Sequence, residues 1–135
     1  MRPKVLIVDD EANIRQILLF VLNPVSDTLE AANGRDALRL IQSEKPSLVL
    51  LDIAMPEMDG YAVLKAALEL VPTLYVVMLT GQQDIKVIQR FLEAGARAYI
   101  TKPFDPKVLR SEVGRVLDDL TTPSDSYRPW RIAPS

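Results

Sequence analysis

Short apolar runs alternate along the chain with longer segments in which apolar residues recur at helical spacing. Most of these runs are continuous and rich in Val, Ile and Leu, which is typical of parallel strands that are buried on both faces. The runs are Val5 to Val8, Thr28 to Ala31, Leu48 to Leu51, Leu74 to Leu79 and Ala98 to Ile100. The run at Thr28 is the most polar, so we expect it at an edge of the sheet.

The segments between and after the runs predict helices. Their apolar residues recur at intervals of three and four positions, as they do along one side of a helix. The stripes are Ile14, Ile17, Leu18, Val21 and Leu22; Ala37, Leu38 and Ile41; Val63, Leu64, Ala67, Leu68 and Val71; Ile85, Ile88, Phe91 and Leu92; and Leu109, Val113, Val116, Leu117 and Leu120. Asn33 with Gly34 and Asp59 with Gly60 mark helix starts, and Gly95 marks a helix end.

A strand followed by a helix, repeated along the chain, implies right-handed crossovers and a parallel sheet covered by helices on both faces. We therefore predict an α/β fold: a doubly wound five-stranded parallel sheet with the flavodoxin-like order 2-1-3-4-5. Residues 1–120 form this domain. Residues 121–135 have no periodicity and are rich in Pro and Ser, so they are expected to be a flexible tail or the start of a linker, with Trp130 packing loosely on the domain or on a neighbour.

Composition excludes several function classes. The 16 basic and 18 acidic residues give a net charge of −2, without the basic surplus of a nucleic-acid binder. The chain has no histidine, so any histidine chemistry must come from a partner. It has no cysteine, and no apolar run approaches the ~20 residues of a membrane span. We expect a cytoplasmic protein that binds neither membrane nor, through this segment, nucleic acid.

Chemically competent side chains follow four of the predicted strands, as Asp9 with Asp10, Asp52, Thr80 and Lys102. The carboxyl ends of parallel strands share one edge of the sheet, and the predicted strand order brings the first and third strands together there. Three carboxylates in one place repel each other by about 4 kcal/mol per pair at 4 Å and an effective dielectric constant near 20. A hard divalent cation would compensate, and oxygen ligands favour Mg²⁺.

Asp9-Asp10, the segment from Leu51 to Gly60, Thr80-Gly81 and Lys102-Pro103-Phe104 resemble the receiver domain of two-component response regulators. The resemblance spans about residues 4–120. It implies that Asp52 is the phosphoacceptor, that Thr80 donates its hydroxyl to a phosphoryl oxygen and that Lys102 pairs with the phosphoryl charge. The metal ligands that it implies are Asp10 directly, Asp9 through water, Asp52, and the backbone carbonyl of Ala54.

The resemblance also implies a partner and a switch. A histidine kinase or a histidine phosphotransfer protein would phosphorylate Asp52, so the chain would be a signalling receiver that catalyses only its own phosphorylation and dephosphorylation. Tyr99 stands where the family has its rotating aromatic, and the Lys102–Pro103 peptide is expected to be cis. Helix four, strand five and helix five would form the read-out surface and a homodimer contact.

Other interpretations stay open at this point. Taken alone, Asp9, Asp10 and Glu11 fit the charged start of a helix, and Thr80 or Lys102 fits an ordinary surface residue. The chain also fits a Mg²⁺-dependent aspartate-nucleophile phosphohydrolase, although Glu11 replaces the second aspartate of a DxD arrangement, or an interaction module that switches without phosphate. Ala54, Gly81 and Gln82 leave the dephosphorylation rate open, and the sequence does not specify the kinase, the output or a following effector domain.

Overall fold

The computed structural model describes residues 2–55, 59–81 and 85–121. Strands and helices alternate throughout these residues. The strands are β1 (Lys4–Val8), β2 (Asp27–Ala31), β3 (Leu48–Asp52), β4 (Tyr75–Thr80) and β5 (Ala98–Thr101). The helices are α1 (Ala12–Leu22), α2 (Gly34–Glu44), α3 (Gly60–Leu70), α4 (Ile85–Glu93) and α5 (Pro106–Thr121).

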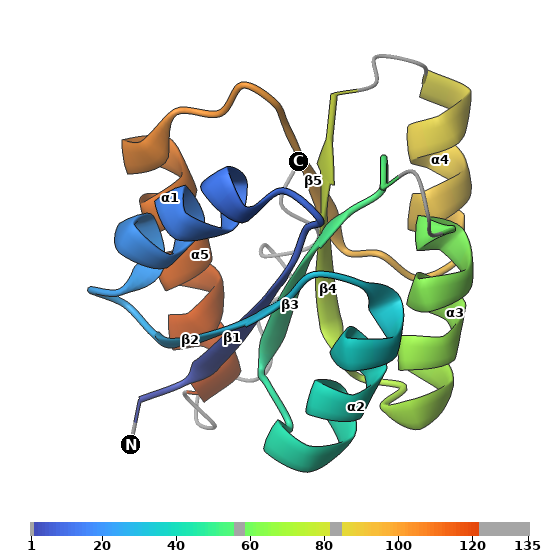
Figure 1. The fold of residues 1–135 in the computed structure, drawn as a ribbon, viewed down its shortest axis with the longest axis horizontal. Helices are drawn as coiled ribbons and strands as arrows, with labels where there is room; N and C mark the ends of the chain where they lie inside the picture. Colours follow the sequence, from blue (N-terminus) through green and yellow to red (C-terminus); the bar gives the residue numbers. More distant parts are fainter. Residues whose placement is uncertain (1, 56–58, 82–84, 122–135) are drawn as a thin grey trace.

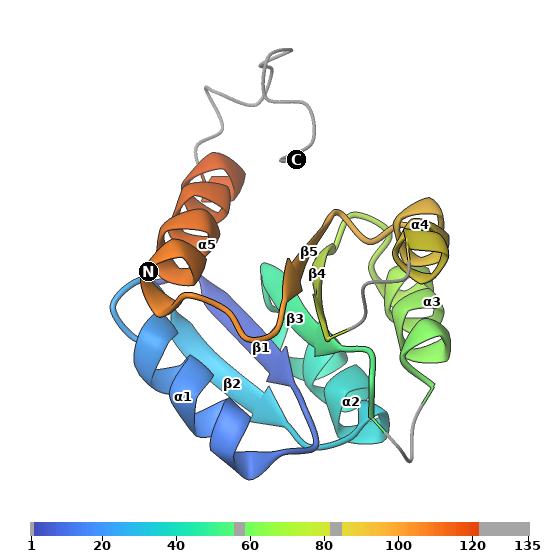
Figure 2. The same ribbon diagram turned by 90° about the horizontal axis from the view of Figure 1, so that it is seen from above.

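The strands form one parallel sheet in the order β2-β1-β3-β4-β5, which confirms the predicted doubly wound fold. Helices α1 and α5 cover one face of the sheet, and α2, α3 and α4 cover the other (Figures 1 and 2). The polar second run forms the edge strand β2, as predicted. All strands therefore end at the same edge, where the predicted site residues follow them.

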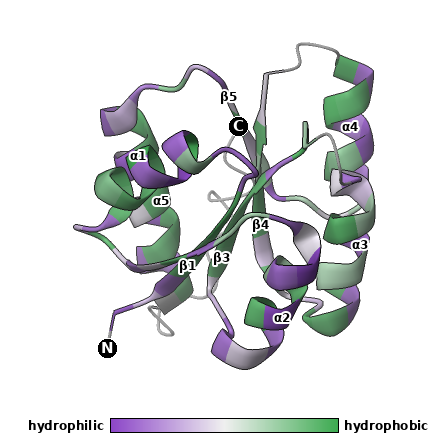
Figure 3. Cartoon of the chain, viewed as in Figure 1, coloured by the Kyte–Doolittle hydropathy of each residue, from purple (hydrophilic) through white to green (hydrophobic). Residues whose placement is uncertain are grey.

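Alternate residues of β1, β3 and β4 enter two separate cores. Val5 and Ile7 of β1 pack with α1 and α5, whereas Leu6 and Val8 pack with α2, α3 and α4. Every residue of β3 and β4 is buried, which explains why these runs are apolar without alternation. Figure 3 shows α1, α4 and α5 banded in hydrophobic and hydrophilic colours, as expected for helices with one side against a sheet.

Two helix starts have the caps that the sequence predicts. The Asn33 side chain accepts a hydrogen bond from the Asp36 amide, and the Asp59 side chain accepts one from the Tyr61 amide. Gly60 follows Asp59 at a crowded position, since a Cβ there would lie 3.0 Å from the Cα of Ile53. The start of α3 is thus held close to the end of β3, which carries Asp52.

The helical stripes overstate burial at four positions. Ile17 is 46% exposed, Ile85 75%, Leu92 38% and Leu120 45%. On α1, Leu18 and Leu22 are fully buried, and Ile17 lies about 100° from Leu18 around the helix. The apolar periodicity shows which side of a helix faces the rest of the protein. Burial of each residue on that side also requires a neighbouring element that covers it.

Gly114 lies inside α5, where glycine weakens a helix by about 1 kcal/mol relative to alanine. A Cβ at this position would meet Val25 Cγ1 at 3.5 Å, an ordinary contact. We expect Gly114→Ala to raise the free energy of unfolding in urea by about 1 kcal/mol. Gly95→Ala is the opposite control, because Gly95 has φ +120° and its Cβ would approach Leu68 to 2.5 Å. A less stable Gly114→Ala variant would contradict this packing.

Candidate functional site

Three aspartates meet where β1 and β3 end. The two strands are neighbours, and the pair Val8 and Leu51 places Asp9 beside Asp52. One carboxylate oxygen from each of Asp9, Asp10 and Asp52 lies within 4.8 Å of the others. Asp9 and Asp52 are buried, whereas Asp10 is exposed. The sheet topology therefore gathers the three predicted carboxylates into one cluster that reaches the surface at Asp10.

Backbone amides hold one oxygen of each buried carboxylate. Asp9 Oδ1 accepts a hydrogen bond of 2.9 Å from the Glu11 amide, and Asp52 Oδ1 accepts one of 2.9 Å from the Ala54 amide. These short-range bonds are the kind by which aspartate side chains fix the turn that follows them. They leave the Oδ2 atom of each residue to face the interior of the site.

Lys102 contacts both of those oxygens. Its Nζ lies 3.2 Å from Asp9 Oδ2 and 3.2 Å from Asp52 Oδ2, and its side chain is 21% exposed. Burial by itself would lower the pKa of Lys102, but the combined attraction of Asp52 and Asp9 raises the pKa above its ordinary value. Lys102 therefore supplies a positive charge between two buried carboxylates.

Thr80 lies at the same edge, at the end of β4. It is fully buried, and its carbonyl accepts a 2.9 Å hydrogen bond from the Lys102 amide. The neighbouring residue Leu79 pairs with Asp52 in the sheet and accepts a bond from the Ile53 amide. The end of β4 therefore lies between the chain segments that carry Asp52 and Lys102. The Lys102–Pro103 peptide is cis, as expected.

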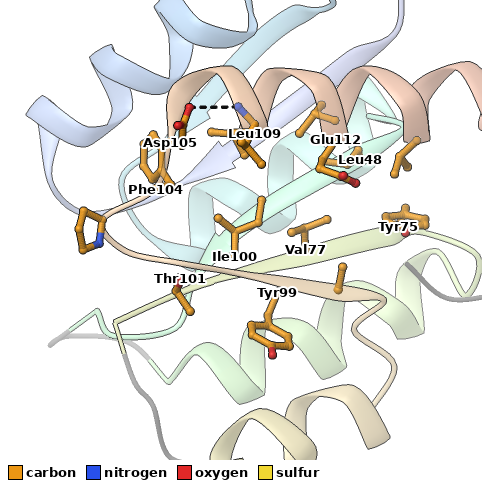
Figure 4. Close-up of a pocket in the computed structure, with 15 residues that line it drawn as sticks. Leu48, Tyr75, Val77, Tyr99, Ile100, Thr101, Phe104, Asp105, Leu109 and Glu112 are labelled. Carbon is orange, nitrogen blue, oxygen red and sulfur yellow. Dashed lines mark hydrogen bonds between the residues drawn. The ribbon is translucent and has the colours of Figure 1, made fainter. Parts of the chain in front are cut away.

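The remaining predicted residues lie around this centre. Tyr99 is 47% exposed on β5, and its ring points to the opposite side of the strand from Ile100 (Figure 4). Ala54 is exposed and contacts Asp52 through its amide. A Cβ at Gly81 would have no atom within 4 Å, so the turn after Thr80 has space around it. Gln82 lies outside the described residues.

Sequence reasoning missed Arg15, which supports the chain at Asp9. Its Nη1 donates to the Asp9 carbonyl at 2.8 Å, and its Nε pairs with Glu30 Oε1 at 2.7 Å. The side chain is only 16% exposed. An arginine shortly after the acidic pair was the available signal, but the pairing with Glu30 depends on how β1 and β2 align.

Burial is the main cause that raises the pKa of Asp9 above its ordinary value, and the charge of Asp52 raises it further. The Glu11 amide and Lys102 act in the opposite direction without reversing the shift. Because the folded-state pKa exceeds the unfolded value, ionised Asp9 costs stability above the folded-state pKa. That cost disappears as the pH falls below the unfolded value near 3.8.

Asp9→Asn should remove this cost. We expect the variant to gain about 0.5–2 kcal/mol of unfolding free energy at pH 7 in EDTA, the usual size of one stabilising substitution. The gain should shrink toward pH 4, where Asp9 of the parent protein is increasingly protonated. Urea titrations across this range measure it, with exposed Asp10→Asn as the control. A variant that is less stable than the parent at pH 7 would refute the account.

The donor set fits a hard divalent cation. Asp9, Asp10 and Asp52 offer only carboxylate oxygens, which are the preferred ligands of Mg²⁺, and they converge from two chain segments. The partly buried ammonium group of Lys102 contacts Asp9 and Asp52, whereas Asp10 is exposed. A bound anion would therefore meet both the candidate cation site and the Lys102 ammonium group at the same edge of the sheet.

A doubly wound parallel sheet with this acidic cluster and lysine at its carboxyl edge defines a receiver domain, and the family comparison agrees. The model of the response regulator receiver domain family matches residues 5–114, and the chain belongs to this family. It is thus a receiver domain of two-component signalling.

Two relatives and one structure illustrate the similarity. The chain is 41% identical over 117 residues to a probable transcriptional regulator ycf27 of Porphyridium aerugineum, covering 86% of this chain and 48% of the relative. It is 39% identical to sporulation initiation phosphotransferase F of Bacillus subtilis, and this match covers 87% of the chain and 95% of the relative. The crystal structure of a CheY-like receiver domain from Methanospirillum hungatei matches the chain with a TM-score of 0.83 and 32% sequence identity. This match covers 89% of the chain and 97% of the crystallised domain.

The chain spans about half the length of the ycf27 regulators and nearly all of the phosphotransferase. Among the described residues, no helix combines the length and apolar character needed to cross a membrane.

Proposed function

We propose that Asp52 accepts a phosphoryl group from a histidine kinase or a histidine phosphotransfer protein. The observation that carries this proposal is the environment of the Asp52 carboxylate. Oδ1 is held by the Ala54 amide, and Oδ2 lies 3.2 Å from Lys102 Nζ. Asp9 and Asp10 lie close enough to share a cation with it. The chain has no histidine, so the phosphohistidine donor belongs to the partner.

In the proposed transfer, an Asp52 carboxylate oxygen attacks phosphorus in line with the bond to the donor. The new bond joins that oxygen to phosphorus, while the donor's bond breaks and its electron pair leaves with the donor. Asp9, Asp10, Asp52 and the Ala54 carbonyl would hold Mg²⁺, which neutralises charge on the phosphoryl oxygens when bound. Lys102 would pair with the same charge, and Thr80 would donate its hydroxyl to a phosphoryl oxygen.

Phosphorylation would also switch the conformation of the domain, because Lys102 would exchange its present contacts for the phosphoryl group. Reversing an equilibrium from 1:99 to 99:1 takes about 5.5 kcal/mol, whereas one charge-assisted hydrogen bond contributes ~1.5–3 kcal/mol. Thr80 alone is therefore insufficient, and Lys102 and an inward movement of Tyr99 must contribute. The surface of α4, β5 and α5 would report the change to a partner or to a second copy of the chain, in the cytoplasm.

Acetyl phosphate with Mg²⁺ tests this function without a cognate kinase. Intact-mass measurement should show the addition of one phosphoryl group, and borohydride trapping with peptide mapping should place it on Asp52. EDTA should prevent the addition. A lack of adduct under conditions that preserve the fold, or an adduct on another residue, would overturn the proposal.

Two further measurements, turnover of phosphate esters and Mg²⁺ binding, separate the alternatives. A phosphohydrolase would turn over phosphate esters many times, whereas a receiver reacts once per phosphorylation cycle. An interaction module that switches without phosphate would gain no mass and would show no Mg²⁺ binding by calorimetry. The cluster of three aspartates with its lysine favours the receiver over both alternatives.

A further inference from the structure

A largely apolar groove lies between β5 and α5. Its volume is about 430 Å³, within the usual range of small-molecule and peptide side-chain pockets. Figure 4 shows Val77 and Ile100 of the sheet facing Leu109 of α5 across it, with Tyr75 toward one end and Phe104 toward the other. The groove is thus formed by the sheet near its β5 edge and by α5 as far as Val116.

The groove is open to solvent at its rim. Val108, which lines the groove, is 59% exposed, an unusually high value for a large apolar residue. The charged residues that line the groove are Asp105 and Glu112, both acidic. An occupant with an aromatic or aliphatic centre and flanking positive charges would match this surface.

The sequence beyond α5 contains such a segment. Residues 122–135 lie outside the described residues, and they include Tyr127-Arg128-Pro129-Trp130-Arg131-Ile132. Trp130 is the only tryptophan of the chain, and arginines stand on either side of it. We propose that the segment Tyr127 to Ile132 binds the groove between β5 and α5 of its own chain, with Trp130 against the apolar lining and the arginines toward Asp105 and Glu112.

The connection is long enough for this contact. The groove reaches Val116 on α5, and the remaining part of the helix to Thr121 is about 8 Å long at 1.5 Å per residue. The stretch from Thr122 to Trp130 spans up to about 30 Å when extended. Trp130 can therefore reach back along α5 to the middle of the groove.

Covalent attachment favours this occupant over a second molecule. A binding segment that is joined to its own site by a short connection has an effective concentration on the order of millimolar there. One aromatic side chain buries about 150–250 Å², so even a weak contact is populated under these conditions. The bound segment would cover Val108 and the neighbouring part of α5, and a partner that uses this surface would have to displace it.

Trp130 reports the contact directly. In the full chain at micromolar concentration, we expect its fluorescence to be blue-shifted and to resist acrylamide quenching several-fold better than in the isolated peptide 122–135. Val108→Arg should abolish both effects, because it adds a positive charge beside the acidic rim and opposes Arg128 and Arg131. Phe20→Arg is the matched control, since Phe20 is 79% exposed on α1 and should leave the fluorescence unchanged.

A variant of the segment covers the case in which Val108→Arg disturbs α5. Replacing Arg128 and Arg131 with Glu leaves the folded domain untouched and should expose Trp130 to solvent. The proposal would be overturned if the fluorescence of Trp130 in the full chain equalled that in the free peptide. Protection of Trp130 from acrylamide that rises with protein concentration, together with a dimer in sedimentation, would overturn the proposal in favour of binding between two copies of the chain.

Discussion

Asp52→Asn is expected to abolish the mass increase that acetyl phosphate and Mg²⁺ produce in the parent protein. The amide nitrogen and oxygen of Asn are poor nucleophiles, and the substitution also removes one carboxylate from the cluster of three. Loss of a nucleophile costs a factor on the order of 10⁶ in kcat in a serine protease. An effect of even a small part of this size would leave no adduct in an intact-mass experiment.

The fold should survive the Asp52→Asn substitution. The Asn side-chain oxygen can still accept the hydrogen bond from the Ala54 amide, and one of the two buried negative charges beside Lys102 is removed. Asp59→Asn is the matched control, since Asp59 is exposed and Asn caps a helix as well as Asp does. Undiminished phosphorylation of the Asp52 variant, or its loss in the Asp59 variant, would contradict the assignment.

The fold was predictable because its strands and helices have different patterns of apolar residues in the sequence. Strands β3 and β4 are buried on both faces and therefore read as continuous apolar runs, while β2 lies at the edge and is more polar. The caps at Asn33 and Asp59 were predictable because they are local contacts between neighbouring residues. Right-handed crossovers then leave few ways to arrange alternating strands and helices.

The position of the acidic cluster followed from the same topology, since strand order alone places Asp9 beside Asp52. The contacts of Lys102 did not follow from the sequence, which indicated only a shared edge. Its equal 3.2 Å approach to Asp9 and Asp52 depends on the path of the chain after β5. Arg15 and Glu30 were missed for a similar reason, because their pairing joins α1 to a neighbouring strand.

The surface of α5 and β5 was the least predictable part. Val108 and Leu109 are adjacent and both apolar, yet Val108 is 59% exposed and Leu109 is buried. Sequence period distinguishes the two sides of a helix but cannot show that a side chain borders an open groove, because the groove depends on how α5 packs on the sheet edge.

Lys102→Met should lower the free energy of unfolding by roughly 3 kcal/mol at pH 7 in the absence of divalent cations. Removing one partner of a buried ion pair costs about 3–5 kcal/mol because the other charge stays buried and uncompensated. Here two carboxylates lose the same partner, while the partial exposure of Lys102 places the effect at the lower end of that range. Urea denaturation in EDTA measures the loss.

Lys4→Met is the control for the loss of an ordinary ion pair. Lys4 pairs with Glu44 at 2.9 Å, but both side chains are about 40% exposed, so the loss should stay below about 1 kcal/mol. Millimolar Mg²⁺ should stabilise Lys102→Met more than the parent protein, because the added cation restores positive charge to the aspartate cluster. Equal stabilisation of the two proteins by Mg²⁺ would show that Lys102 and the cation do not act on the same carboxylates.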